Sequence, residues 1–379
     1  MIKGLLKQLL AFILSFFEII APWTVGEVEE WIEGKKGPWT AEMPFDENSF
    51  VKIEKTAGED FRILNLTDIQ LYNRDLYTSE LYQEDSELTL TFLGKIIEDQ
   101  QPDLITISGD SFCGFLTSLE IIDIIDSYDI PWAAVYGNHD AVDGKQSEWL
   151  AYQLEHAENS LFEAGPEEMG YGNYIINLTE DGKVIHTLYM MDTHNQTVTF
   201  EQNGKTYECA DFLWENQMEW YEWGVHGNTQ FAGYLVPSTI IMHKPMKEYR
   251  TAWYKVATKR TEEAPFGTVK PECADIAFGY CGEDGGWTSP NNYFERIKAL
   301  GSTKDIIVGH NHLNSYSVLY EGVRLTYAVK SGYGGRGYYD KNLIGGTILT
   351  INSAGETTIS QAYYTEENGV WAQERVETE

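Results

Sequence analysis

The chain has 379 residues, of which 42% are hydrophobic, 13% aromatic and 23% charged. This composition is typical of a globular protein and excludes the disordered, collagenous and coiled-coil classes. Because 27 basic and 59 acidic residues give a net charge of −32, the electrostatic attraction on which general nucleic-acid binding depends is absent, and no nucleic acid is expected as a general partner.

Residues 1–22 form the membrane-like stretch of the sequence, in which Lys3 and Lys7 precede an apolar run that stops at Pro22. The run resembles a signal peptide without a small-x-small cleavage pattern, and it is short for a spanning helix and carries Glu18. Its polar and small residues recur every three or four positions, which also fits an amphipathic helix on a membrane or a helix packed on the body. We favour membrane association through 1–22, or export, over a cytoplasmic location.

Residues 23–60 are rich in Trp, Pro, Gly and Glu and predict an irregular lead-in. From Phe61 onward, apolar runs rich in β-branched residues alternate with amphipathic patterns, which indicates an α/β domain over 61–364. The predicted strands are Arg62–Thr67, Leu104–Ser108, Trp132–Tyr136, Val184–Met190, Ser238–Met242, Asp305–Val308, Arg324–Val329 and Thr347–Ile351. Helices are predicted at Ser86–Asp99 and Leu119–Tyr128, and on a further helix Trp214, Trp220 and Trp223 are expected in the core.

A long segment near the C-terminal third, about 251–292, is rich in Gly, Pro and charged residues and predicts a functional insertion between two strands. The closing segment, 365–379, is acidic and is expected to fray at the surface. The four cysteines form no C-x-x-C pair, which excludes a zinc ribbon and a cystine-rich module. The sequence leaves open whether one disulfide bridge forms, between Cys273 and Cys281.

Polar residues that can bind metals follow five of the predicted strands. Ligand sites of α/β folds lie at the carboxyl ends of strands, so these residues are expected to meet. The five groups are Asp68 with Gln70, Gly109-Asp110, Gly137-Asn138-His139-Asp140, His243, and Gly309-His310-Asn311-His312. Each group alone is more often a turn or a structural contact than a ligand, and only their combination predicts a site.

In this order the five groups resemble the signature of the calcineurin-like metallophosphoesterase superfamily: D-x-H, G-D-x-x, G-N-H-D/E, a later His, and G-H-x-H, over about 61–329. The segments His243–Tyr249, Asp211–Tyr221 and VGHNHLNSY are similar to the purple-acid-phosphatase-like single-domain branch. The resemblance implies a four-layer α/β/β/α sandwich of two mixed sheets flanked by helices. Cys113 stands where the purple enzymes have an iron-binding tyrosine, so no tyrosinate colour is expected.

The resemblance also implies two divalent metal ions, most readily Mn, Fe or Zn, bridged by Asp110. The remaining ligands would be Asp68, Gln70 and His312 for the first ion, and Asn138, His243 and His310 for the second. Gln70 replaces the usual His, and its neutral amide oxygen should shift the first position towards oxygen-preferring ions, weaken it or abolish it. We expect binding to be retained, because the other ligand positions match.

Within this set the catalytic residues would be His139 and Asp140, with His139 protonating the leaving oxygen or stabilising the transition-state charge and Asp140 orienting its ring. Substrate contacts are expected from Asn138, His139 and Arg336, although the Gly-rich segment around Arg336 equally fits a connecting turn. Residues that could line the cleft or shape substrate access are Asp192, His194, Glu283, Asn291 and Asn292. No role is assigned to His156, His186 and His226.

The expected function is binuclear metal-dependent hydrolysis of a phosphate mono- or diester, by attack of a metal-bridging hydroxide. A small phosphoester is the expected substrate, because the acidic composition disfavours a nuclease. If residues 1–22 bind a lipid bilayer, lipid-derived phosphoesters become more favoured substrates. The alternative is a non-catalytic or weakly active binding or scaffold protein with the same fold, and Gln70 is the residue that motivates it.

Overall fold

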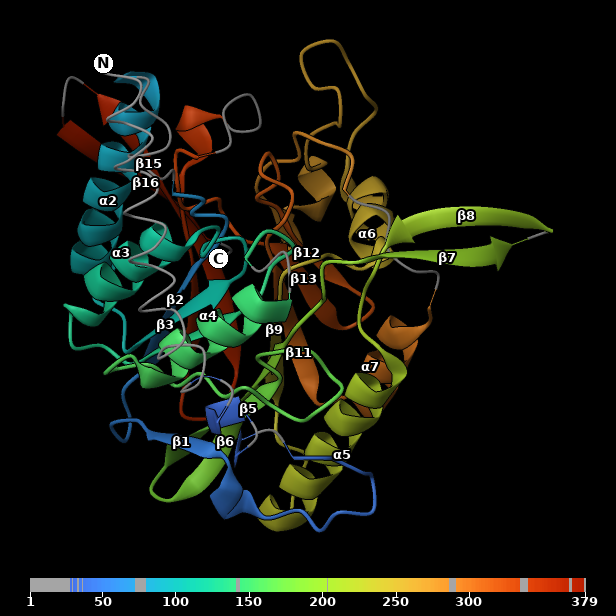
Figure 1. Ribbon diagram of the computed structural model, residues 1–379. Coiled ribbons are helices and arrows are strands. Elements are labelled where there is room, and N and C mark those ends of the chain that lie inside the picture. The colour runs from blue at the N-terminus through green and yellow to red at the C-terminus, as the bar shows by residue number, and fades with distance from the viewer. Residues whose placement is uncertain are drawn as a thin grey trace, which may run out of the picture.

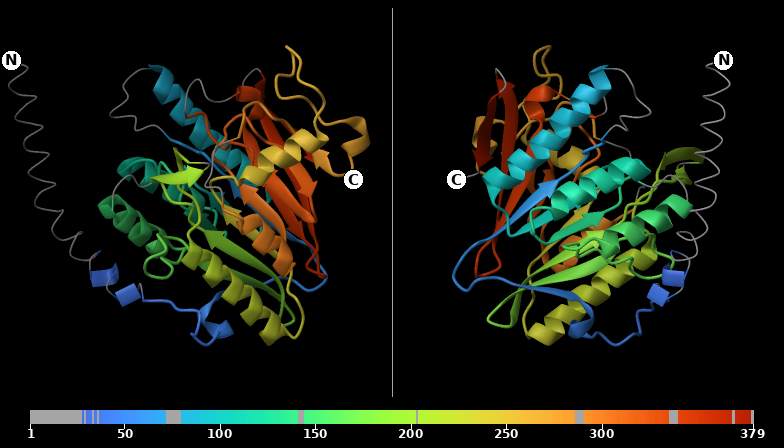
Figure 2. Two further views of the ribbon diagram at one scale, coloured as in Figure 1. Left: turned by 90° about the vertical axis from the view of Figure 1, so that its right-hand side faces the viewer. Right: turned by 60° about the vertical axis from the view of Figure 1, so that its left-hand side comes forward.

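Two β-sheets stack face to face, with helices on both outer faces, as the two further views of Figure 2 show. The computed structural model describes residues 28, 30–32, 34–35, 37–71, 80–140, 144–202, 204–285, 291–334, 340–367 and 370–377. Both sheets mix parallel and antiparallel pairs. The expected four-layer sandwich of two mixed sheets flanked by helices is therefore confirmed.

The six-stranded sheet is built around three parallel strands that follow one another in the chain. Its strands, in spatial order, are β16 (Val370–Glu377), β15 (Thr357–Glu367), β14 (Gly345–Ile351), β2 (Phe61–Leu66), β3 (Leu104–Ser108) and β4 (Trp132–Val135). β2, β3 and β4 are parallel, whereas β14, β15 and β16 are antiparallel to their neighbours. The helices beside this sheet in Figure 1 are α2 (Glu80–Gln100), α3 (Phe115–Asp126) and α4 (Gly144–His156).

The eight-stranded sheet has a parallel centre. Its strands, in spatial order, are β1 (Val51–Glu54), β5 (Tyr174–Glu180), β6 (Lys183–Met191), β9 (Ser238–Met242), β11 (Thr303–Val308), β13 (Val323–Tyr327), β12 (Ser317–Tyr320) and β10 (Ala277–Phe278). The helices on its side are α5 (Glu215–Ala232), α6 (Lys247–Val256) and α7 (Tyr293–Leu300). A separate hairpin of β7 (Thr197–Gln202) and β8 (Lys205–Ala210) projects from the body (Figure 1). The described residues also contain three short 3-10 helices: Glu47–Ser49, Pro271–Cys273 and Lys341–Leu343.

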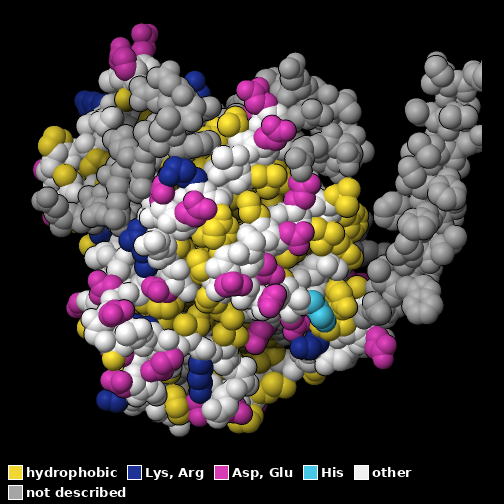
Figure 3. All heavy atoms as spheres, turned by 90° about the vertical axis from the view of Figure 1, so that its left-hand side faces the viewer, with side chains coloured by type: hydrophobic (Ala, Val, Ile, Leu, Met, Phe, Trp, Pro, Cys, Tyr) yellow, Lys and Arg dark blue, Asp and Glu magenta, His cyan; other side chains and the backbone are white. Residues whose placement is uncertain are grey.

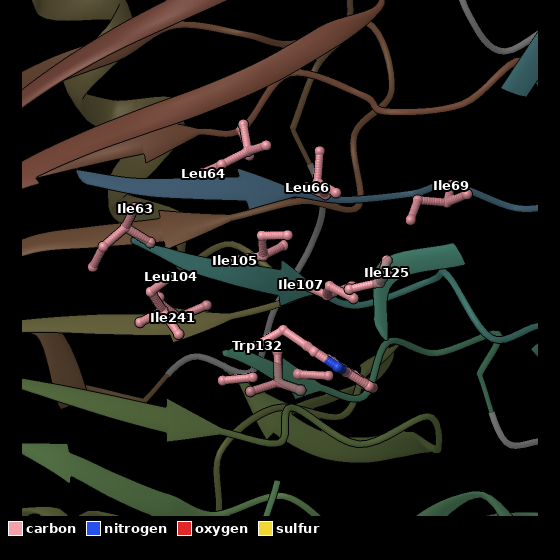
Figure 4. Packing of buried hydrophobic residues seen from close by; sticks show 14 of the residues in the cluster. Ile63, Leu64, Leu66, Ile69, Leu104, Ile105, Ile107, Ile125, Trp132 and Ile241 are labelled. Atoms are coloured by element: carbon pink, nitrogen blue, oxygen red, sulfur yellow. The ribbon is translucent and has the colours of Figure 1, made fainter. Parts of the chain in front are cut away.

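The main core fills the space between the sheets and under α2 and α3. Figure 4 shows Ile63, Ile105 and Trp132 from the parallel strands beside Ile241 of the other sheet and Ile125 of α3. β3 is buried along its whole length, which explains its unbroken apolar sequence, because a central parallel strand is covered on both faces. A second core cluster lies between the eight-stranded sheet and its own helices; it includes Met218, Tyr221, Tyr249, Trp253 and Phe294.

Each predicted strand is present, with ends shifted by at most two residues. The two predicted helices fall in α2 and α3, and the tryptophan-rich segment forms α5. Trp220 is buried as expected, whereas Trp214 and Trp223 are only partly buried. The described part of the 251–292 segment begins inside α6 and contains β10, which pairs with β12.

Two expectations about the ends of the chain are wrong, and the open question of one disulfide bridge is answered. The described residues 365–367 and 370–377 do not fray, because they form the end of β15 and β16, which pair from Ser360↔Glu377 to Glu367↔Val370. Edge strands accept charged residues readily, so an acidic composition does not exclude a strand there. The lead-in 23–60 contains β1, which pairs in parallel with β5. Cys273 and Cys281 are both free thiols.

Residues 1–22 and Arg336 lie outside the described residues, so membrane association and the substrate contact of Arg336 stay predictions. No helix in the described ranges is both long and apolar enough to cross a membrane.

Candidate metal centre

The predicted site residues come together where the carboxyl ends of the parallel strands of both sheets meet. Asp68, Asp110 and Asn138 follow β2, β3 and β4 of one sheet, and His243 and the loop with His310 follow β9 and β11 of the other. Hydrogen bonds join the two sheets at this edge, and two of them involve predicted site histidines. His243 Nδ1 lies 2.8 Å from the backbone oxygen of Ser108, and the His310 backbone N–H donates to Asp68 Oδ2 at 3.0 Å.

Two overlapping groups of side chains could each hold a metal ion. Asp110, His243 and His310 form one group, and Asp68, Asp110 and His312 form the other, with the ligand atoms of each group within 4.8 Å of one another. Asp110 Oδ2 lies 3.2 Å from His243 Nε2, and Asp68 Oδ1 lies 3.3 Å from His312 Nε2. Asp110 belongs to both groups, so its carboxylate is the one placed to bridge two ions.

Beyond the His312–Asp68 and His243–Asp110 contacts given above, three buried atoms of this cluster have no hydrogen-bond partner within the part of the chain that the structure describes: Asp68 Oδ1, Asn138 Oδ1 and His243 Nε2. Such orphaned atoms are rare in folded proteins, because an unpaired buried polar atom is costly. The Ser108 carbonyl can only accept a hydrogen bond, so the proton of a neutral His243 sits on Nδ1 and Nε2 offers a lone pair. Carboxylate, amide and imidazole ligands suit Mn, Fe or Zn, so the residues present fit a metal ion.

The charges of the cluster shift the pKa values of its members strongly. Burial raises the pKa of the Asp68 carboxyl, but the neighbouring His312, His243 and Lys330 outweigh burial and hold this pKa below its ordinary range. Burial lowers the pKa of His243, but the Asp110 and Asp68 carboxylates outweigh it and raise the pKa to about 9. A metal ion held by His243 Nε2 would have to displace that proton, because an imidazole ligand must be neutral.

The backbone at the site is held in conformations that non-glycine residues rarely adopt. Asp68, Asp110 and His310 have positive φ angles of 52°, 50° and 76°. Strained backbone of this kind clusters at functional sites, where the surrounding structure fixes it. Gly137 permits a close approach to Asp110, because a Cβ atom at this position would lie 2.2 Å from Asp110 Oδ1.

Asp140 was expected to orient the His139 ring, but its hydrogen bonds go to backbone N–H groups. Its Oδ1 accepts the backbone N–H groups of Ser111 at 2.6 Å and Phe112 at 2.5 Å, and its Oδ2 accepts that of Gly137 at 2.7 Å. Its carboxylate thus ties the loop after β3 to the loop after β4, and in the described structure it makes no hydrogen bond to the His139 ring. Burial and the charge of Asp110 raise the pKa of Asp140 to about 7.

His139 presents its ring to solvent at the edge of the cluster. Its side chain is 64% exposed, and its Nε2 lies 3.9 Å from Asp110 Oδ2. Its backbone N–H donates to Asp110 Oδ1 at 2.8 Å. The backbone of His139 therefore positions Asp110, while the ring stays available to a molecule that enters from solvent.

Gln70 is held by a lysine that the sequence analysis did not single out. Lys330, which is 1% exposed, donates from Nζ to the backbone oxygen of Asp68 at 2.5 Å and to Gln70 Oε1 at 3.3 Å. Burial lowers the pKa of Lys330 to about 8. The signal in the sequence is a lysine directly after the apolar run of β13, a position where a charge needs a specific partner.

The other candidate residues surround the cluster. His194 stacks on Trp214 with ring centroids 3.8 Å apart, and its backbone N–H donates to Asp192 Oδ1 at 2.8 Å. Glu283 Oε1 accepts the N–H of Leu313 at 3.0 Å and so supports the loop that carries the paired histidines. Lys247 Nζ donates to the backbone oxygen of Asn291, and Asn292 precedes α7. Their expected roles in the cleft stay predictions.

The chain is similar to several known proteins. Residues 61–322 match the family model described as calcineurin-like phosphoesterase. The chain is 25% identical over 316 residues to "Probable inactive purple acid phosphatase 14" of Arabidopsis thaliana, covering 73% of this chain and 72% of that protein. It is 26% identical to "Phosphatase DCR2" of Saccharomyces cerevisiae, covering 70% of this chain and 46% of that protein. A solved dimetal phosphatase from Danio rerio is 10% identical with a TM-score of 0.42, covering 84% of this chain and 99% of that chain.

Proposed function

Because the chain belongs to the calcineurin-like phosphoesterase family, we propose that it hydrolyses phosphate mono- or diesters with two divalent metal ions. The observation that carries the proposal is Asp110, whose carboxylate is shared by two groups of ligand side chains. Two bound ions, with Mn, Fe or Zn most suited to these ligands, would act as Lewis acids on the phosphoryl group and lower the pKa of a bound water to about 7.

In this proposal the side chains of six residues and Asp110 would bind the ions, and backbone hydrogen bonds would fix the loops that carry them. Asp68, Gln70 and His312 would bind on one side of Asp110, and Asn138, His243 and His310 would bind on the other. This division is supported by the three orphaned atoms, because each ion would contact at least one of them. The first ion would contact Asp68 Oδ1, and the second would contact Asn138 Oδ1 and His243 Nε2. Asp140 acts as a positioning residue, because it fixes the two loops that carry Asp110 and Asn138.

His139 is the proposed proton donor to the leaving oxygen. Its exposed ring and the 3.9 Å distance from its Nε2 to Asp110 Oδ2 place an imidazole beside the ligand cluster without using it as a ligand. An imidazole exchanges a proton near neutral pH, which general acid catalysis requires. Asn138, His139 and Arg336 are the proposed substrate contacts.

A small phosphoester is the substrate that the surface favours. Acidic side chains are scattered over the face shown in Figure 3, in keeping with the net charge of −32. A polyanion such as nucleic acid would be repelled over its length, whereas a small phosphate group meets only the local field of the bound cations.

The test is hydrolysis of p-nitrophenyl phosphate and of its bis ester by protein loaded with Mn, Zn, Fe, Co or Mg. Asp110→Asn is expected to abolish both the hydrolysis and the bound metal. The matched control is Asp305→Asn, because Asp305 is also a buried aspartate but lies near the start of β11, away from the site. Retention of metal by Asp110→Asn would contradict the proposed bridge.

The same assay distinguishes the proposed hydrolase from the alternative, a non-catalytic or weakly active binding protein. That alternative is supported by Gln70 in place of a histidine and by the word "inactive" in the name of the Arabidopsis relative. Metal binding without hydrolysis of either ester under any of the five metals would favour it.

A further inference from the structure

The two histidines of the loop after β11 are held in place by different parts of the molecule. We propose that Glu283, which lies between β10 and α7, is the positioning residue of His312 and thereby orients a ligand of the first ion, that of Asp68, Gln70 and His312. The inference rests on the proposed function, because it concerns a proposed metal ligand. It gives the 251–292 segment a role at the metal centre.

His310 is fixed by the other ligand segments. The backbone N–H of Gly309 donates to the backbone oxygen of His243 at 3.0 Å, and the N–H of His310 donates to Asp68 Oδ2 at 3.0 Å. His243 and Asp68 are themselves proposed ligands. The position of His310 therefore follows from the arrangement of the metal centre itself.

The two chain neighbours of His312 are held by side chains from outside the ligand set. Tyr327 of β13 donates from its hydroxyl to Asn311 Oδ1 at 2.9 Å. Leu313 donates its backbone N–H to Glu283 Oε1 at 3.0 Å. Because these two bonds lie on either side of His312 in the chain, they determine where its imidazole is presented.

Glu283 is itself held against this loop, so that its carboxylate has a fixed position. The backbone N–H groups of Gly282 and Glu283 both donate to Asn314 Oδ1, at 3.1 and 3.2 Å, and that of Gly282 also donates to the backbone oxygen of Leu313 at 2.9 Å. A Cβ atom on Gly282 would lie 2.7 Å from the same Leu313 oxygen, so the close approach requires glycine. The two segments therefore behave as one unit.

The affinity of a metal site depends on how well its ligands are oriented before the ion binds. A histidine on a loop that samples other conformations must be ordered on binding, which costs conformational entropy. Groups that orient a ligand from outside the ligand set are usually worth about 10–100-fold in metal affinity. The bond from Leu313 to Glu283 orders the loop when the chain folds, so this cost is not met again when the ion binds.

Three variants at position 283 separate the hydrogen bond from the charge. Glu283→Gln keeps an oxygen that can accept from Leu313 but loses the charge. Glu283→Asp keeps the charge but is one methylene too short to reach the N–H of Leu313. Glu283→Ala loses both. If Glu283 acts through the hydrogen bond, the glutamine variant should resemble the wild type and the other two should not.

The first measurement is a calorimetric titration of the metal-free full chain with Mn²⁺. Glu283→Asp and Glu283→Ala should raise one of the two dissociation constants by about 10–100-fold and leave the other unchanged. The affected constant should be the one that His312→Ala raises, and not the one that His310→Ala raises. Unchanged constants in Glu283→Ala, or a loss of affinity in Glu283→Gln as large as that in Glu283→Ala, would overturn the inference.

Hydrogen exchange of the metal-free chains tests the same bond without any ion. The Leu313 amide should exchange at least about tenfold faster in Glu283→Asp and Glu283→Ala than in the wild type, because it loses its acceptor. In Glu283→Gln it should exchange at the wild-type rate. Equal rates in all four chains would overturn the inference. Should Glu283→Ala fail to fold, Glu283→Asp and Glu283→Gln carry both measurements.

The control is Glu180→Ala. Glu180 Oε1 also accepts a backbone N–H, that of Gly58 at 2.7 Å, but Glu180 lies opposite Lys183 at the start of β6, at the other end of the sheet from the ligands. Neither the dissociation constants nor the exchange of Leu313 should change in this variant. Changes equal to those in Glu283→Ala would show a general loss of stability and would overturn the inference.

Failure of the proposed function gives a different result, because neither measurement requires hydrolysis. Two bound ions with the expected response at position 283, but no hydrolysis of either ester, count against hydrolysis alone. Hydrolysis by the wild type together with unchanged constants in Glu283→Ala counts against the inference alone.

Discussion

Asn138 and His139 are neighbours in the chain, yet their side chains meet different surroundings. Asn138 Oδ1 is buried without a hydrogen-bond partner among the described residues, whereas the His139 side chain is 64% exposed. The bond that holds Asp110 comes from the backbone of His139 and not from its ring. The two different roles proposed for Asn138 and His139, metal ligand and proton donor, are therefore compatible with their adjacent positions.

This difference predicts that His139→Ala lowers turnover and leaves the bound metal unchanged. Removal of the ring should cost about 10²–10⁴-fold in kcat, which is the usual contribution of a general acid. The measurement is kcat together with the metal content of the purified variant. Asn138→Ala serves as the comparison and should lose metal. Loss of metal from His139→Ala would show that its ring is a ligand.

Gly137 gives a second prediction for a single residue. A methyl group at this position would lie 2.2 Å from Asp110 Oδ1 and 2.3 Å from its backbone nitrogen, so Gly137→Ala must displace Asp110. We expect loss of bound metal and of hydrolysis, measured by metal analysis and by the p-nitrophenyl phosphate assay. Gly37→Ala is the matched control, because no atom lies within 4 Å of the added methyl group there. Full metal content in Gly137→Ala would contradict the proposed position of Asp110.

At the scale of the elements, Asp140 joins the ends of two parallel strands. Three backbone N–H groups, those of Ser111, Phe112 and Gly137, depend on its carboxylate. The loops after β3 and β4 carry Asp110 and Asn138, so the positions of these two proposed metal ligands depend on the hydrogen bonds of Asp140. The same carboxylate therefore stabilises the fold and the site.

We expect Asp140→Ala to lower the free energy of unfolding by about 2–4 kcal/mol, because three buried N–H donors lose their acceptor. Metal affinity should fall as well. The measurement is urea unfolding of the metal-free protein, followed by a metal titration. Asp123→Ala, on the exposed face of α3, is the control and should change neither quantity. Equal unfolding curves for the two variants would contradict this role of Asp140.

The strands that carry the site could be predicted from the sequence, because buried parallel strands produce short apolar runs that end at polar residues. β3 and β9 follow this pattern over their full length. The strand β16 could not be predicted, since its charged residues are compatible with an edge and its pairing partner is what makes it a strand. Lys330 and the backbone bonds of Asp140 also escaped prediction, because contacts between distant segments leave no local pattern.

On the scale of the whole molecule, the two sheets are also joined at the end opposite the site. His186 of β6 places Nδ1 3.0 Å from the backbone oxygen of Gly355, in the turn between β14 and β15, and Nε2 2.9 Å from Thr239 Oγ1 of β9. The side chain is fully buried, so it links the eight-stranded sheet to the six-stranded one without solvent. The sequence offered no sign of this role, because neither partner is near His186 in the chain.

Burial lowers the pKa of His186 from 6.5 to about 4. Between these two values the unfolded chain binds a proton at this position and the folded chain does not, so stability rises with pH across this window. The contribution of His186 is complete above pH 6.5 and is lost as the pH falls towards 4. Its size is about 3 kcal/mol for a shift of this extent.

We therefore expect the free energy of unfolding of the wild type, minus that of His186→Gln, to fall by about 3 kcal/mol between pH 6.5 and 4. The measurement is urea unfolding of metal-free protein across this range. The two free energies are subtracted because Asp305 has the opposite effect. Burial raises the pKa of Asp305 to about 6, so its contribution to stability increases as the pH falls, and it does so equally in the wild type and in His186→Gln. Exposed His226→Gln is the control, and its curve should run parallel to that of the wild type. A parallel curve for His186→Gln would mean that the sheets are not held together through a neutral imidazole.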